Sequence, residues 1–147
     1  MFSRYFSKHE FERSQTADRL RIDNSLTPSA TSNLQYLVDK VLQPLRQSLM
    51  QPIRITSGFR CPELNIAIRG SSTSQHMKGE AADIKVAGYS AEELANHIVY
   101  SGVPFDQLIW YDVQRGGHVH IALSKPVDSR QVLHAPKSGG YVHWSVK

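Results

Sequence analysis

The chain has 147 residues, which is enough for one domain with a substantial buried core. Hydrophobic residues make up 40% of it and charged residues 20%, a globular composition that excludes a disordered, collagen-like or coiled-coil protein. The formal net charge of +4 favours anionic partners. The basic residues are dispersed and form no nucleic-acid-binding signature, so we expect no nucleic-acid partner.

Several classes of segment are absent from the sequence. No apolar run is long enough to span a bilayer, so we expect no membrane partner. Residues 1–6 lack the apolar stretch of a signal peptide, which predicts synthesis in the cytoplasm. The single cysteine, Cys61, excludes an internal disulfide and a cysteine-rich metal site. Any bound metal must therefore be held by His, Asp or Glu, and the seven histidines are the unusual feature of the composition.

The N-terminal third is predicted to be helical and rich in turns. Ser7 and Glu10 form a capping box, which predicts a short helix from Lys8. Residues 18–32 are polar and predict a loop.

A longer amphipathic helix is predicted over residues 34–49, where Leu and Val recur at helical spacing. Thr27, which precedes a proline, and Ser32 can each cap its start. Pro44 lacks a backbone donor and clashes with the preceding turn, so we expect a kink or break near Leu42.

The rest of the chain predicts a small sheet. Alternation of apolar and polar residues predicts strands at 53–57, 82–86, 108–111 and 119–123. Helices are predicted at 62–68 and from the capping residue Ser90 to Gly102, and residues 125–147 form a weakly patterned tail with an edge strand expected at 141–146. This order of elements indicates one α+β domain, residues 1–147, with a small, mostly antiparallel sheet and flanking helices.

Histidines and an aspartate are predicted to share one face of this sheet. Side chains alternate along a strand, and the apolar residues beside His118 and His120 claim the core face, so both imidazoles lie on the other face. Asp83 faces away from the core for the same reason, and the turn at Gly79 lets His76 fold back beside it. Two or three imidazoles and a carboxylate form the ligand set of a catalytic zinc site with one position open for water. The alternative is a group of ordinary surface histidines, and the shared face favours the metal site.

Three segments of the sequence match a longer pattern. Residues 74–83 read SQHMKGEAAD, residues 117–121 read GHVHI, and residues 57–60 read SGFR, with Asn65 following. They resemble, in that order, the SxHxxGxAxD motif, the HxH-type metal motif and the SGYR…N element of the M15 family of zinc D-Ala-D-Ala peptidases. The resemblance covers about residues 34–124, the motif-bearing part of the chain.

The resemblance implies a fold, a site and an activity. It implies the small α+β fold shared by hedgehog-type domains and DD-peptidases, with zinc (Zn2+) held by His76, Asp83 and His120, and with Arg60 and Ser74 facing the substrate. The implied activity is hydrolysis of peptidoglycan stem peptides through a metal-activated water, either as a D-Ala-D-Ala carboxypeptidase or as an L-Ala-D-Glu-type endopeptidase. The implied partner is the bacterial cell wall, and several family members are phage lysis enzymes.

The general base is where this sequence departs from the family. Many members place Glu or Asp three residues before the last metal histidine, where this chain has Gly117. We expect Asp112, just after the third strand, to act as the base and His118 to stabilise the transition state. If neither serves, the alternative is a non-catalytic zinc-containing module of the same fold that binds the cell wall.

Overall fold

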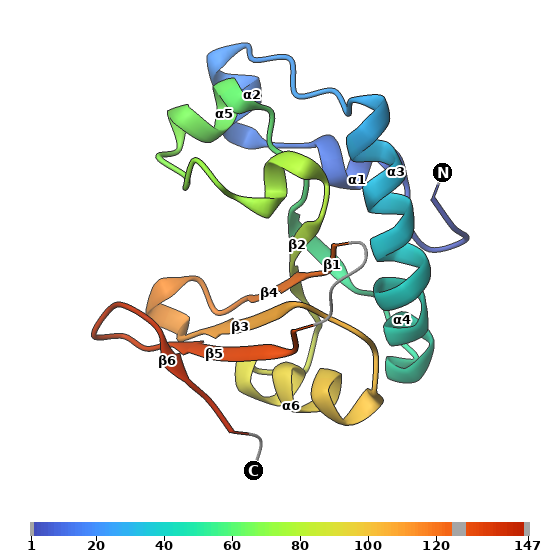
Figure 1. Ribbon diagram of the computed structural model, residues 1–147, viewed down its shortest axis with the longest axis vertical. Coiled ribbons are helices and arrows are strands. Elements are labelled where there is room, and N and C mark those ends of the chain that lie inside the picture. Colours follow the sequence, from blue (N-terminus) through green and yellow to red (C-terminus); the bar gives the residue numbers. More distant parts are fainter. Residues whose placement is uncertain (1, 125–128, 146–147) are drawn as a thin grey trace.

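A mixed sheet forms the centre of the computed structural model, which describes residues 2–124 and 129–145. The strands are β1 Arg54–Ser57, β2 Ala81–Lys85, β3 Gln107–Tyr111, β4 Val119–Ala122, β5 Gln131–Ala135 and β6 Val142–His143. They form a six-stranded sheet in the order β1-β2-β4-β3-β5-β6 (Figure 1). All neighbouring pairs are antiparallel except β3 and β5, which are parallel. The predicted α+β class with a mostly antiparallel sheet is confirmed.

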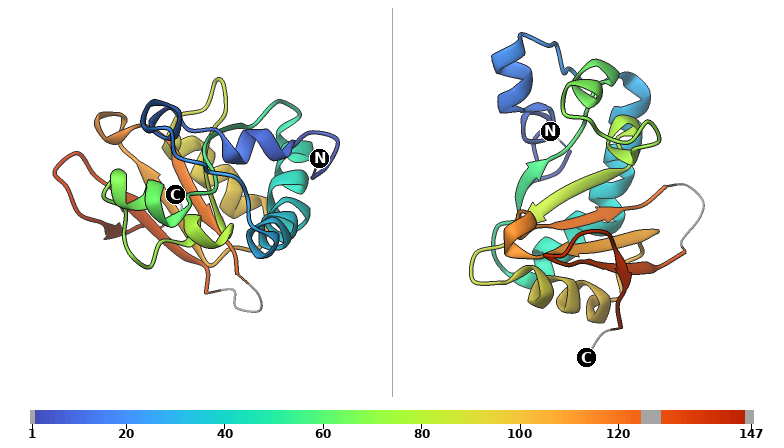
Figure 2. Two further views of the ribbon diagram at one scale, coloured as in Figure 1. Left: turned by 90° about the horizontal axis from the view of Figure 1, so that it is seen from above. Right: turned by 90° about the vertical axis from the view of Figure 1, so that its left-hand side faces the viewer.

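Helices cover one face of this sheet and gather at one end of the molecule (Figure 2). They are α1 Lys8–Glu12, α2 Gln15–Leu20, α3 Pro28–Leu37, the π-helical turn η1 Val38–Leu42, α4 Gln43–Leu49, α5 Pro62–Ala67 and α6 Ala91–Ser101, with short 3₁₀ turns η2 Gln75–Lys78 and η3 Val113–Arg115. Among the described residues, no helix combines the length and apolar character needed to cross a membrane.

The predicted loop over residues 18–32 is wrong at its start, and at its end the structure confirms Thr27, one of the two candidate caps, as the helix cap. The helix α2 extends to Leu20, and Ser14 caps its start by accepting a hydrogen bond from the Ala17 amide at 3.2 Å. The helix α3 begins at Pro28, where the Thr27 hydroxyl accepts a hydrogen bond from the Ala30 amide at 3.1 Å. Polar capping residues therefore begin helices inside a stretch whose composition resembles a loop.

The long helix is interrupted close to the predicted position. Pro44 lies at the start of α4 and cannot donate a backbone hydrogen bond. The chain accommodates it by widening to the π-helical turn η1 immediately before. Both parts still bury their apolar face, because Leu34, Leu37, Val41 and Leu45 are each fully buried.

The tail contains a strand that the sequence did not reveal. The strand β5 runs parallel to β3, and its residues are only partly buried, so it lacks a clear apolar alternation. The edge strand expected at 141–146 is present as β6, which pairs with β5. Residues 125–128 and 146–147 of the predicted tail lie outside the described residues.

The two faces of the sheet differ in the way that the alternation predicts. The core face carries Ala82, Ile84, Leu108, Val119 and Ile121, all fully buried. The helix α6 packs against β3 and β4 on this side and contacts α4. The opposite face therefore carries the polar residues that alternate with the core residues, and it holds the candidate site.

Gly79 joins the candidate site to the helical layer. Its φ is +74°, and a Cβ there would lie 3.0 Å from the Cα of Ala30 in α3. Asn33 of the same helix donates a hydrogen bond to the Lys78 carbonyl at 2.9 Å. The helix α3 thus supports the turn η2, and only glycine allows the close backbone approach.

Replacing Gly79 should therefore destabilise the fold more than its φ alone accounts for. We expect Gly79→Ala to lower the free energy of unfolding by about 2–4 kcal/mol, because the left-handed backbone and the clash with α3 both contribute. Gly102→Ala is the matched control, since Gly102 has a φ of +77° and open space around it, and it should cost about 1–2 kcal/mol. Denaturant unfolding measures both, and equal losses would show that the contact with Ala30 is unimportant.

Candidate metal centre

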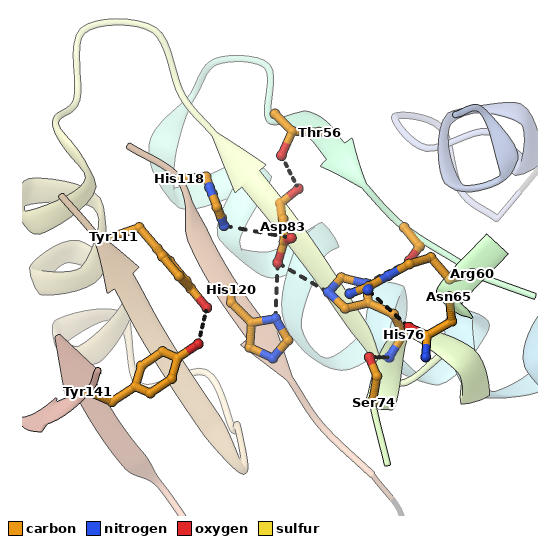
Figure 3. Close-up of polar contacts among 11 residues, drawn as sticks. Thr56, Arg60, Asn65, Ser74, His76, Asp83, Tyr111, His118, His120 and Tyr141 are labelled. Atoms are coloured by element: carbon orange, nitrogen blue, oxygen red, sulfur yellow. Dashed lines mark hydrogen bonds and ion pairs between the residues drawn. The ribbon is translucent and has the colours of Figure 1, made fainter. Parts of the chain in front are cut away.

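Three side chains, from η2, β2 and β4, converge on the face of the sheet opposite the core (Figure 3). Asp83 of β2 lies directly opposite His120 of β4 in the antiparallel register, and His76 arrives from η2. The Asp83 Oδ1 atom lies 3.3 Å from His76 Nε2 and 3.0 Å from His120 Nδ1. One donor atom from each residue can be chosen so that all lie within 4.8 Å of one another, which is close enough to hold one metal ion. The structure thus brings together the three residues expected to be metal ligands.

The orientation of His76 indicates that a cation belongs between these groups. Its Nδ1 atom lies 2.7 Å from the carbonyl oxygen of Gly58, and a carbonyl only accepts, so Nδ1 carries the ring proton. In the neutral ring the Nε2 lone pair then faces the Asp83 carboxylate at 3.3 Å. Two acceptors at this distance repel each other, so either a proton on Nε2 or a metal cation must lie between them. A backbone carbonyl that fixes the tautomer in this way is a typical support of a metal-binding histidine.

Asp83 supplies the negative charge of the centre. Burial alone would raise the pKa of its carboxyl, but the positive charge of protonated His76 and His120 rings, and the hydrogen bonds that these rings then donate, hold that pKa well below its usual range. The carboxylate is therefore ionised at neutral pH. Two imidazoles and one ionised carboxylate are a donor set that suits a divalent transition metal.

His118 lies beside the ligands with its ring held on both sides. Its Nε2 atom is 3.7 Å from Asp83 Oδ2, and its ring stacks on Tyr111 with centroids 4.3 Å apart and planes at 20°. On the other side, a Cβ at Gly116 would lie 2.7 Å from His118 Nδ1, so glycine is required for this approach. Burial lowers the pKa of His118 below its ordinary value, despite the opposing effect of Asp83.

The metal centre forms the floor of a cleft of about 290 Å³. Arg60 and Ser74, the residues expected to face the substrate, both line it. Asn65 positions Arg60 by accepting a hydrogen bond from its Nη1 at 3.1 Å, while the buried Nε atom has no partner among the described residues. The Ser74 hydroxyl also accepts a hydrogen bond from the His76 amide at 3.3 Å, so Ser74 caps η2 as well.

The wall opposite Arg60 includes a residue of the C-terminal tail, where the sequence analysis predicted no site residue. Tyr141, between β5 and β6, lines the cleft, and its hydroxyl oxygen lies 3.4 Å from that of Tyr111. Arg115 lies over both rings, 5.6 Å from the Tyr111 centroid and 5.3 Å from the Tyr141 centroid. Burial, with a smaller contribution from the Tyr141 hydrogen bond, raises the pKa of Tyr111. The cluster of glycine and aromatic residues at 139–144 was the available signal for this hairpin.

The structure does not bring Asp112, the expected base, to this cluster. Its Oδ1 atom lies 2.9 Å from His134 Nε2, and its Oδ2 atom accepts a hydrogen bond from the Lys137 amide at 2.6 Å. The His134 ring stacks on Trp110 at 3.6 Å, and Trp110 belongs to the core face of the sheet. The Asp112 carboxylate therefore faces away from the metal centre. It joins the end of β3 to the hairpin formed by β5 and β6.

Comparison with known proteins agrees with this geometry. A family model described as Peptidase M15 matches residues 4–122. The match covers most of the chain, so the protein belongs to the M15 peptidase family, which is metal-dependent. A search of curated proteins finds no match. The cluster of His76, Asp83 and His120 is the site in the described residues that could hold the metal.

Metal binding should stabilise the fold through this cluster. Adding Zn2+ to the metal-free protein at about 100 times its dissociation constant should raise the melting temperature by about 5–10 °C, because the ion binds only the folded chain. The shift should vanish in His120→Ala and persist in His143→Ala, whose exposed side chain lies on β6 away from the cluster. Thermal scans with and without chelator measure it, and an unchanged shift in His120→Ala would exclude this site.

Replacing Asp112 should loosen the hairpin in a pH-dependent way. The His134 and Lys137 hydrogen bonds lower the pKa of Asp112, so its contribution to stability is present above the ordinary pKa of about 3.9 and is lost as the pH falls through the lowered value. Asp112→Asn should therefore unfold more readily than the parent at pH 5–8, and the difference should shrink below about pH 4. Amide hydrogen exchange in β5 should quicken at neutral pH, with zinc affinity unchanged.

Asp23→Asn is the control for this experiment. Asp23 also accepts hydrogen bonds that lower its pKa, but from Ser25, in a loop distant in sequence from the hairpin. The Asp23→Asn substitution should leave amide hydrogen exchange in β5 unchanged. Loss of zinc from Asp112→Asn would contradict the assignment of this carboxylate to the hairpin.

Proposed function

We propose that this M15 peptidase is a zinc enzyme that hydrolyses peptidoglycan stem peptides and acts on the bacterial cell wall. The observation that carries the proposal is the His76 lone pair facing the Asp83 carboxylate at the floor of a cleft. Such a floor suits a metal cation, and a cleft with guanidinium on one wall and phenols on the other suits a peptide that carries a carboxylate. The net charge of +4 favours an anionic cell wall in the same way.

Zinc suits the donor set best. Two imidazoles and one carboxylate, with the cleft left open above them, match the three-ligand pattern of catalytic zinc sites. When bound, zinc supplies a Lewis acid and lowers the pKa of a water to about 7. Asp83, which carries the negative charge, and His76, fixed by the Gly58 carbonyl, would hold the ion in a defined place.

Side chains around the cleft bind the substrate and transfer the proton. Arg60 binds a carboxylate or carbonyl of the substrate through its guanidinium, and Ser74 donates to the peptide backbone. Tyr111 and Tyr141 form the opposite wall. His118 takes the proton that the attacking water loses and passes it to the leaving amine, because its ring is the titratable group held beside the ligands by stacking. Both a D-Ala-D-Ala carboxypeptidase and an L-Ala-D-Glu-type endopeptidase fit this assignment.

One observation favours a second candidate, a zinc-containing module that binds the cell wall without cutting it. Asp83 is the one carboxylate among the described residues that line the cleft, and it is a metal ligand. Gly117 occupies the position where many family members carry a carboxylate, and Asp112 faces the hairpin. Without His118 as base, the protein would bind and not cleave.

Mass spectrometry of muropeptides digested with the zinc-loaded protein separates the two candidates. The peptidase should release defined peptides, and the masses of the products identify the bond that is cut. His118→Ala should lower kcat about 100- to 10,000-fold while zinc affinity stays within a few-fold of the parent. His143→Ala, on the exposed edge strand, should keep full rate. Stoichiometric zinc with intact muropeptides would establish the binding module instead.

A further inference from the structure

A second, larger cavity lies next to the metal cleft. Its volume is about 750 Å³, and it lies between the N-terminal helices, the strand β1 and the start of α5. Its lining includes Arg13, Arg54, Thr56 and Arg60, and we call it the basic pocket. Arg60 lines both the basic pocket and the metal cleft, so the two cavities meet at this side chain.

The basic pocket carries more positive than negative charge, although Asp83 attracts Arg60 from the neighbouring cleft. Asp18 is the one carboxylate among the described residues of its lining, against the guanidinium groups of Arg13, Arg54 and Arg60. Within residues 2–124 and 129–145, none of these arginines forms an ion pair. An unpaired cluster of guanidinium groups in a cavity is a site for an anion.

Two of these arginines are held in place by uncharged partners. The Nη2 atom of Arg13 donates to the Ile55 carbonyl at 3.2 Å, and Nη1 of Arg60 donates to Asn65 Oδ1 at 3.1 Å. The Arg60 Nε atom is buried and has no partner in the described part of the chain. A buried donor without a partner costs free energy.

The floor of the basic pocket continues the face that carries the metal ligands. Ile55 is buried in the core, so Arg54 beside it faces the other side of β1, and Thr56, which lies at the bulge between Ile55 and Ser57, also lines the pocket. The Thr56 hydroxyl donates to the Asp83 carbonyl at 3.2 Å, which joins the two floors (Figure 3). Neighbouring strands lie about 4.8 Å apart and an extended peptide rises about 3.3 Å per residue, so a peptide crossing from the metal reaches the pocket within about two to four residues.

We propose that the basic pocket binds a carboxylate of the substrate that lies about two to four residues from the bond that is cut. The inference rests on the proposed peptidase function and adds a preference to it. Peptides with several free carboxylates bind better than peptides in which the distant carboxylate is amidated. A short substrate such as a dipeptide, which cannot reach the pocket, is a poor one. This length requirement favours endopeptidase action.

Calorimetry on the zinc-loaded full chain tests the pocket directly. The probes are a stem peptide with free carboxylates and the same peptide with its internal glutamate amidated. Arg54→Gln should weaken binding of the free peptide about 10-fold and leave the amidated peptide unchanged, because it removes one charge-assisted contact. The parent should lose affinity for the free peptide as salt rises, and the variant should lose less.

Arg19→Gln is the matched control, since Arg19 is an exposed arginine of α2 that does not line the pocket. Arg13→Gln gives a second test, and circular dichroism checks that each variant folds. Equal weakening of both peptides, no weakening in either pocket variant, or no binding of the free peptide would overturn the inference. Hydrolysis is recorded separately. Tighter binding of the free peptide than of the amidated peptide, without cleavage, refutes the proposed peptidase function alone. Cleavage without this difference in binding refutes the proposed role of the basic pocket alone.

Discussion

The opposition between the His76 lone pair and the Asp83 carboxylate is the constraint on which the site depends. Folding brings the two acceptors to 3.3 Å, because the Gly58 carbonyl fixes the imidazole and the β2–β4 pairing fixes the carboxylate. The arrangement costs free energy when the ring is neutral and is favourable when a proton or a metal cation lies between the two atoms. The close approach of Gly79 to Ala30 and the Asn33 hydrogen bond to the Lys78 carbonyl attach η2, the turn that carries His76, to the helical layer.

The sequence was informative where a buried face fixed the side-chain direction. The core residues of β2 and β4 determined the register, and that register placed Asp83 opposite His120. His76 was predictable from its motif, although its tautomer was not, since the Gly58 carbonyl that sets it is distant in the sequence. Asp112 could not be placed because it follows the end of β3, where alternation no longer applies, and its direction depends on His134.

The hairpin was hidden for a related physical reason. The strand β5 pairs in parallel with β3, a long-range contact that leaves little local pattern, and its residues are mostly half-buried. Yet its turn places Tyr141 on the cleft, and Arg115 ties that turn to η3 by donating to the Gly140 carbonyl at 2.6 Å. The segment also lies beyond residues 4–122, the part matched by the family model. The wall it forms is therefore a feature of this chain outside the family match.

Floor and walls of the site consequently come from different parts of the sheet. The candidate metal ligands Asp83 and His120 lie on β2 and β4, whose pairing is fixed by the core, so their geometry can change little without unfolding. The basic pocket lies at β1, and the tyrosine wall lies at the end of β3 and in the turn between β5 and β6, towards the other edge of the sheet. Edge elements contribute fewer buried contacts and tolerate substitution better. In the proposed function, the metal chemistry is therefore placed where the fold is rigid, and the proposed substrate contacts lie where the fold can vary.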